Sequence, residues 1–282
     1  MRRLRSIRLR TQVIAYTALF CLMFLSIYVQ GNMIESVGKL TSSDVLLIDA
    51  GHGGFDGGAQ SASGVPEKDI NLAIALQIKE LAQKDGWKVI MTREEDVSLA
   101  EDAKGAIRSK KTADLTARKA LIDKVSPNLT ISIHLNSFTE DRSVRGAQVF
   151  YPAVPKGKEL TTQGDRGSSP EGSHEGNSEG SPEAVSKKIA EGIQAQLISD
   201  LNDGKARTAL AKSDVLILKN VKTPIVLVEC GFLSNREEAE LLQQVNYQKK
   251  LALSIYTGAM QSMGKTAVKV DKLRVIDSKE QI

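Results

Sequence analysis

The chain has 282 residues, of which 41% are hydrophobic and 26% are charged, so it can form one sizeable globular domain with appendages. Its formal net charge is +4, but the first ten residues include five arginines, and the rest of the chain therefore carries −1. A near-neutral body gives no reason to propose a nucleic-acid partner, because proteins that bind nucleic acids need clustered basic charge. The two cysteines, Cys21 near the N-terminus and Cys230 far along the chain, exclude a disulfide framework.

Residues 1–34 are predicted to be a signal anchor that spans a membrane. Residues 11–34 carry no charge, and Val13–Val29 is apolar enough and long enough to cross about 30 Å of hydrocarbon. We favour a retained anchor over a cleaved signal peptide because the apolar run exceeds a typical signal core and no A-x-A-like cleavage site follows. The arginines would stay in the cytoplasm, which places the body outside. Residues 35–43 are a polar connector.

The first predicted strand is Val45–Ile48, a short apolar run that ends at Asp49. It leads into a loop with five glycines, whose backbone can adopt angles that a Cβ atom forbids. This loop carries His52, one of three histidines in the chain. Since open α/β sheets place their chemistry at the carboxyl ends of buried strands, we interpret His52 as a metal ligand.

A helix is predicted over residues 70–81, where apolar residues recur at helical spacing. Pro66 and the acids Glu67 and Asp69 suit the start of this helix. Glu67 therefore has two interpretations that spacing does not separate. It is either an acid favoured by the helix dipole or a further metal ligand.

The next predicted elements are a strand over residues 87–92, an exposed charged connection over residues 93–111 that borders the site, and a helix over residues 113–125. Arg118 lies among the apolar residues of this helix. It is a candidate for binding a substrate carboxylate, although an arginine in such a pattern more often forms a salt bridge or faces solvent.

A third strand, Leu129–Ile133, is followed directly by His134 and then by Asn136. A second histidine placed like His52 at the end of a strand strengthens the metal interpretation. We take Asn136 as a candidate substrate-binding residue. Residues 146–151 predict another strand.

Residues 157–182 are rich in glycine, serine and glutamate with almost no large apolar residues, which predicts a flexible surface insertion. His174 lies in this insertion and is expected to be solvated. The elements predicted after it are helix 183–201, strands 215–218 and 225–228, and helix 247–263. Ser234 and Glu237 predict a capping box for a helix between the last two. Residues 265–282 are expected to form a charged tail.

Strands that alternate with helices predict an α/β fold, with a mainly parallel twisted sheet of about six strands flanked by helices. Residues 44–264 would form a single catalytic domain. The strand at 225–228 ends in Glu229, and a carboxylate directly after four apolar residues is costly unless it is paired or bound. Because the carboxyl ends of parallel strands share one edge, we expect His52, His134 and Glu229 to converge, with Glu67 close to the first.

Two imidazoles, a carboxylate and an open position are the ligand set of a catalytic zinc site, so we expect one zinc ion. The remaining carboxylate would act as a general base and then as a general acid. Spacing does not show which glutamate has which role. The chain lacks the HExxH motif of common zinc peptidases, a phosphate loop and a nucleophile elbow.

Four motifs resemble the zinc-dependent N-acetylmuramoyl-L-alanine amidases of bacterial cell walls, the amidase_3 type. They are DAGHGG at residues 49–54, Glu67 before a helix, SIHLN at residues 132–136 and VECGFLSN at residues 228–235, and the similarity spans residues 44–263. The resemblance implies that His52, Glu67 and His134 bind zinc and that Glu229 is catalytic. It also implies hydrolysis of the amide between the lactyl group of N-acetylmuramic acid and L-alanine of the stem peptide.

Within this family, residues 110–124 and the short N-terminal anchor resemble amidases of sporulation and germination. Such enzymes strip peptides from spore-cortex muramic acid so that a muramic acid deacetylase can form muramic-δ-lactam. This implies a spore-envelope location and a deacetylase as a co-acting partner.

Three alternatives stay open: a vegetative cell-wall amidase or autolysin, a zinc peptidase that cuts within the stem peptide, and a non-catalytic wall-binding protein. Under all of these interpretations peptidoglycan is the expected partner. The protein is expected on the outer face of a bacterial cytoplasmic membrane, anchored there or released to the wall.

Overall fold

The computed structural model describes residues 44–154, 180–201 and 207–265. The predicted signal anchor, the connector, residues 157–179 of the glycine-rich insertion with His174, and residues 266–282 of the tail lie outside the described residues. Among the helices of the described ranges, none combines the length and the hydropathy that crossing a membrane requires.

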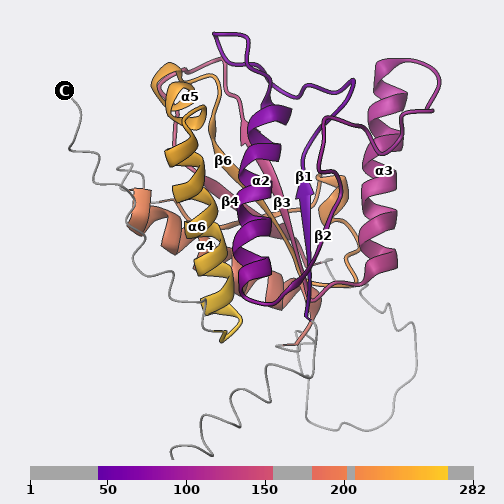
Figure 1. The fold of residues 1–282 in the computed structure, drawn as a ribbon, viewed down its shortest axis with the longest axis vertical. Helices are drawn as coiled ribbons and strands as arrows, with labels where there is room; N and C mark the ends of the chain where they lie inside the picture. The colour runs from indigo at the N-terminus through magenta and orange to yellow at the C-terminus, as the bar shows by residue number, and fades with distance from the viewer. Residues whose placement is uncertain (1–43, 155–179, 202–206, 266–282) are drawn as a thin grey trace, which may run out of the picture. The chain divides into compact units, whose positions relative to one another are not determined.

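Six strands form one sheet in the order β2-β1-β3-β6-β4-β5 (Figure 1). Their bounds are β1 Val45–Ala50, β2 Lys88–Met91, β3 Leu129–Asn136, β4 Gln148–Pro152, β5 Leu210–Lys212 and β6 Ile225–Phe232. The four strands β2, β1, β3 and β6 run parallel, whereas β4 runs antiparallel to β6 and β5 runs parallel to β4. The predicted α/β fold with a mainly parallel sheet is therefore confirmed.

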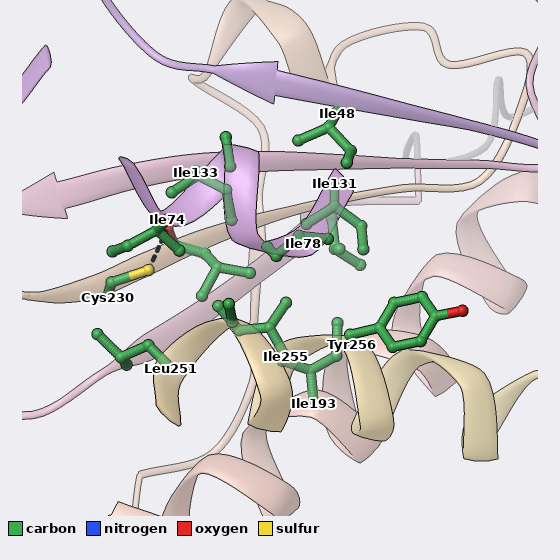
Figure 2. Packing of buried hydrophobic residues seen from close by; sticks show 14 of the residues in the cluster. Ile48, Ile74, Ile78, Ile131, Ile133, Ile193, Cys230, Leu251, Ile255 and Tyr256 are labelled. Atoms are coloured by element: carbon green, nitrogen blue, oxygen red, sulfur yellow. Dashed lines mark hydrogen bonds between the residues drawn. The ribbon is translucent and has the colours of Figure 1, made fainter. Parts of the chain in front are cut away.

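Helices cover both faces of this sheet, as a mainly parallel sheet requires. They are α2 Glu67–Lys84, α3 Ile107–Val125, α4 Pro182–Leu201, α5 Arg236–Leu242 and α6 Val245–Ser262. The helix α6 contacts both α2 and α4, and the three form a group from which α3 lies apart (Figure 1). Figure 2 shows Ile74 and Ile78 of α2, Ile193 of α4 and Ile255 of α6 packed beside Ile131 of β3.

Successive residues of β1 face opposite sides of the sheet, so one strand supplies both cores. Leu46 and Ile48 pack with the group of three helices. Leu47 packs on the other side with Ile122 of α3 and Ile217. All three strand residues are fully buried, which fixes the register of β1 and hence the point at which the chain leaves the sheet toward His52.

The predicted strand at residues 215–218 is wrong, because Leu216–Leu218 forms a short 3-10 helix, η1. Its Ile217 and Leu218 are buried in the core that also contains Leu47 and Ile122. The apolar run therefore indicates that these residues are buried, and not that they pair in a strand. The strand β5 was not predicted, because it is only three residues long and is largely exposed.

The predicted capping box is also wrong, because the helix cap lies one residue later than predicted. Asn235, and not Ser234, caps α5, and its side chain accepts a hydrogen bond from the Glu238 N–H at 3.0 Å. The Ser234 hydroxyl instead accepts the N–H of Phe138 at 2.8 Å. Ser234 is therefore committed to the loop that follows β3.

Arg118 is buried below the glycine loop, with a relative exposure of 1%. Its guanidinium binds Asp49 through Nη1 at 2.7 Å and Asp114 through Nε at 2.6 Å. The same group donates to the carbonyl oxygens of Ala50 at 2.8 Å and His52 at 2.5 Å. The predicted role of Arg118 in binding a substrate carboxylate is therefore wrong, because two internal carboxylates and two carbonyls already occupy its donors.

A second buried arginine completes this support. Arg93 donates to the carbonyls of Ala50 at 2.9 Å, Gly51 at 3.0 Å and Lys68 at 2.8 Å. The predicted exposed connection is wrong at this residue, which has a relative exposure of only 3%. Gly53, with a φ of +134°, lets the loop pass close to Arg93, since a Cβ atom there would lie 2.8 Å from the Arg93 side chain.

Asp49 is ionised in this network. Burial alone would raise the pKa of Asp49, but the charges of Arg118 and His134 and the hydrogen bonds from Ser132 and Arg118 together outweigh burial and lower it. The Ser132 hydroxyl donates to Asp49 at 2.6 Å, and the Thr92 hydroxyl donates at 2.9 Å. Asp49 and Arg118 therefore form a charged buried pair that fixes the end of β1.

We expect Arg118→Met to lower the free energy of unfolding by about 3–5 kcal/mol, because it leaves two buried carboxylates without their counter-charge. Urea unfolding followed by circular dichroism measures this change. Lys84→Met is the matched control, since it removes an exposed pair with Glu80 and should cost about 0.5 kcal/mol or less. Equal losses for the two variants would contradict the role assigned to Arg118.

Candidate metal centre

The carboxyl ends of β1, β3 and β6 bring the predicted site residues to one edge of the sheet. His134 and Glu229 are direct register partners across β3 and β6. Ala50, at the end of β1, pairs with Ile133, so His52 follows two residues beyond the same edge. Glu67 is the first residue of α2, where the chain returns to the sheet.

His52, Glu67 and His134 each offer one ligand atom, and these atoms lie within 4.8 Å of one another. Glu67 Oε1 is 3.2 Å from His52 Nε2 and 3.2 Å from His134 Nδ1. The two imidazole rings meet at 75° with their centroids 5.0 Å apart. Two nitrogens and one carboxylate oxygen that converge in this way fit a zinc ion with one open position.

The charges of the cluster favour a cation. Burial alone would lower the pKa of His52, but hydrogen bonds with Asp56 and Glu67 raise it to about 9. Burial alone would raise the pKa of Glu67, yet its hydrogen bonds with His134 and His52 hold it well below the usual range of a glutamate. The cluster therefore stabilises positive charge between its members, as a metal site must.

Besides the two imidazoles, three groups hold the Glu67 carboxylate in place. Its carboxylate accepts the backbone N–H of Ala59 at 2.9 Å and of Leu135 at 3.0 Å, and the side-chain amide of Asn71 at 3.2 Å. The residue is only 3% exposed. Because the carboxylate faces the imidazoles and is aimed by these donors, the geometry favours a ligand over a solvent-facing acid of the first helical turn.

Two residues that support this cluster were missed by the sequence analysis. Asp56 Oδ2 is 2.9 Å from His52 Nδ1 and orients that imidazole in the way that carboxylates orient histidine ligands of metals. Asn71 is fully buried and binds both Glu67 and the carbonyl of Gly51. The spacing of Asp56 four residues after His52 was the available signal, whereas nothing in the pattern distinguishes Asn71.

Glycines of the loop give the imidazoles their space. A Cβ atom on Gly51 would lie 2.2 Å from the ring of His134. A Cβ atom on Gly58, whose φ is +70°, would lie 2.5 Å from the Glu67 carboxylate. The glycine-rich composition of this loop is therefore a packing requirement of the cluster, as well as a conformational one.

Glu229 differs from Glu67 in its hydrogen bonds and in the direction of its pKa shift. Its Oε2 is buried and has no hydrogen-bond partner among the described residues. Burial is the main cause that raises the pKa of Glu229 to about 7, with the nearby charge of Glu67 acting in the same direction. A carboxyl group with a pKa near neutrality can both accept and return a proton.

Asn136 is tied to its own neighbourhood. Its side-chain oxygen accepts the N–H of Ser137 at 2.8 Å, and its carbonyl accepts the N–H of Leu233 at 2.8 Å. It therefore joins the end of β3 to the chain that follows β6. Its role in substrate binding stays a prediction.

Comparisons with known proteins identify the family of this chain. The model of the N-acetylmuramoyl-L-alanine amidase family matches residues 46–261. The germination-specific N-acetylmuramoyl-L-alanine amidase of Bacillus subtilis (strain 168) is 35% identical over 219 residues, which cover 78% of this chain and 79% of that protein. The amidase AmiC of Escherichia coli O6:H1 is 30% identical over 232 residues, which cover 76% of this chain and 51% of that protein.

A solved structure of the same kind is similar in fold. It is the CwlD amidase from Clostridioides difficile, determined in complex with the GerS lipoprotein. The two chains share 35% sequence identity with a TM-score of 0.65, and the match covers 78% of this chain and 98% of that one. The resemblance that the four motifs indicated is confirmed, and the chain belongs to the N-acetylmuramoyl-L-alanine amidase family, whose members act on peptidoglycan.

Proposed function

We propose that the protein is an exported, zinc-dependent amidase in which His52, Glu67 and His134 hold the metal and Glu229 is the catalytic residue. The observation that carries this proposal is the convergence of three ligand atoms at a strand edge that also presents Glu229 with an unpartnered oxygen. Export is inferred from residues 1–34, whose arginines and apolar run are typical of a signal anchor.

Each group has a distinct task in this reaction. Zinc at the site would activate water and polarise the scissile carbonyl. Asp56 keeps His52 in the tautomer and orientation that present Nε2 to the centre. Glu229 accepts a proton from the attacking water and returns it to the amine of L-alanine, which leaves as the C–N bond breaks, while the lactyl group stays on muramic acid as a carboxylate.

We expect the protein to expose new amino-terminal L-alanine when it digests purified peptidoglycan. Glu229→Gln should lower turnover by about 10²–10⁴-fold, because the amide cannot carry the proton, and zinc should stay bound. Mass spectrometry of the muropeptides identifies the new end, and elemental analysis measures the zinc. A chelator should abolish the reaction.

Other outcomes of the same digestion identify the alternatives. A new amino terminus other than L-alanine would indicate a zinc peptidase that cuts within the stem. Full biological function of Glu229→Gln would indicate a wall-binding protein that does not catalyse. Activity that survives complete removal of metal would contradict the zinc assignment.

The assignment of Asp56 makes a separate prediction. Asp56→Asn should weaken zinc binding by about 10–100-fold, since an amide orients the imidazole less well and adds no negative charge. Competition with a chromophoric chelator measures the affinity. Asp96→Asn is the control, because Asp96 pairs with Lys68 and accepts the Gly54 N–H, whereas the partners of the His52 imidazole are Asp56 and Glu67. An unchanged affinity for Asp56→Asn would contradict the assignment.

We further propose a role in spore-cortex modification. The germination-specific amidase of Bacillus subtilis supports it, because the identity extends over most of both chains. The corresponding reaction removes the peptide from muramic acid, so that a muramic acid deacetylase can follow and muramic-δ-lactam can form. The CwlD amidase was determined with a lipoprotein, which supports a protein partner for this chain in the spore envelope.

Expression of the chain in a Bacillus subtilis strain that lacks its germination-specific amidase tests this role. We expect the wild-type chain, and not Glu229→Gln, to restore muramic-δ-lactam to the cortex. Chromatography of digested cortex with mass detection measures the lactam. Cleavage of vegetative wall without restoration of the lactam would instead indicate an autolysin.

A further inference from the structure

A groove lined by arginines opens on the same edge of the sheet as the metal centre. It has a volume of about 700 Å³, and its lining includes Arg142, Arg145, Arg236, Ser234 and Glu237. We call it the arginine groove. Its lining residues include three arginines and one glutamate, so the groove has a positive local charge on a body that is otherwise nearly neutral.

The groove is bordered by the connections that leave the three strands of the centre. Ala62 comes from the connection after β1, Arg142 and Arg145 from the connection after β3, and Ser234 from the turn after β6. The same three strands deliver His52, His134 and Glu229. The arginine groove and the metal centre are therefore both built from the connections at the carboxyl ends of β1, β3 and β6.

Buried polar groups fix the backbone that presents two of these arginines. The Asn235 side chain donates to the carbonyl of Arg142 at 2.9 Å, and Arg207 donates to the carbonyl of Arg145 at 2.7 Å. The next residue, Gly146, donates its N–H to Glu238 at 2.9 Å. Asn235 and Glu238 are 8% and 5% exposed, so the arginines stand on a well-supported loop.

The guanidinium groups are available to a ligand. Arg142 forms no ion pair with any residue in the described ranges. Arg145 meets Glu237 at a loose 3.5 Å, and Arg236 meets Glu240 at 3.1 Å on an exposed helix surface. Exposed pairs of this kind contribute little, so an incoming carboxylate can replace them. Guanidinium binds carboxylates through two parallel hydrogen bonds.

The cations on the other side of the glycine loop already have partners. Lys111 pairs with Asp56 at 2.7 Å, and Lys110 lies over the ring of Phe55 at 5.9 Å from its centroid. The arginine groove is therefore the better site for an anion next to the metal centre.

We propose that the arginine groove binds the free carboxylates of the stem peptide, on the leaving-amine side of the scissile bond. This inference rests on the proposed amidase function. The sugars of a peptidoglycan strand are uncharged once the lactyl group is joined in an amide, whereas the stem peptide beyond L-alanine carries free carboxylates. Only the peptide side of the substrate matches the charge of the groove, so the groove selects stems whose carboxylates are not amidated.

Paired substrates test this selection with the zinc-loaded full-length protein. One is a muropeptide with free stem carboxylates, and the other is the same molecule with those carboxylates amidated. For the free substrate, Arg142→Gln/Arg236→Gln should raise KM by about three- to tenfold, with kcat and zinc content unchanged. For the amidated substrate, the KM of the wild type should already be high, and the double variant should not change it.

The matched control is Lys84→Gln, which removes one exposed positive charge from the far end of α2 and should leave both KM values unchanged. The same KM for both substrates in the wild type would overturn the proposal. An equal effect of the double variant on both substrates would also overturn it. Hydrolysis of neither substrate by the zinc-loaded wild type would instead contradict the proposed amidase function.

A binding measurement tests the groove without turnover. Calorimetry with the isolated peptide L-alanyl-γ-D-glutamyl-diaminopimelate should show binding to the wild type that weakens about three- to tenfold in the double variant. The amidated peptide should bind the wild type and the double variant equally. Peptide affinity that does not depend on Arg142 and Arg236 would overturn the proposal even if the amidase function holds.

Discussion

The site depends on hydrogen bonds from two buried guanidinium groups to three consecutive backbone carbonyls. The carbonyls of Ala50, Gly51 and His52 leave the sheet at a turn in which His52 has a φ of 62°, and strand pairing no longer satisfies them. Arg93 and Arg118 supply the missing donors. Burying Arg118 would be costly alone, but Asp49 and Asp114 offset its charge. The direction of the His52 imidazole follows from this anchoring.

Two glutamates reach the same strand edge, and their surroundings give them opposite properties. Glu67 is surrounded by donors that favour its ionised form, whereas Glu229 has a buried oxygen without a partner and a pKa raised by burial. Environments that push two carboxyl groups apart in pKa are typical of a division between a charge-stabilising and a proton-transferring role. The ambiguity that spacing left between the two acids is thus addressed by hydrogen bonds and burial.

The sequence predicts those features that depend only on strands and their ends. His134 and Glu229 follow apolar runs, and parallel pairing makes their convergence a consequence of topology. The ion pair between Arg118 and Asp49 could not be predicted from the sequence, because the two residues are 69 positions apart. Helical periodicity does not show whether a buried acid lies next to an arginine. The only sequence signal for a paired arginine is Asp114, which lies four residues before Arg118 on α3 and therefore on the same side of the helix. The short exposed strand β5 carries too little apolar pattern to be recognised.

The reversed direction of β4 decides where the long glycine-rich segment joins the domain. Since β4 pairs antiparallel with β6, Gln148 lies opposite Glu229 and the chain then runs back toward the start of β6. The first turn of α4 lies at that same end, because Ser186 accepts the N–H of Ile225. The end of β4 and the start of α4 thus both lie at the end of the sheet opposite the reacting centre. Engineered tags or reporters introduced between Val154 and Gly180 would therefore be attached at the end of the sheet opposite the reacting centre.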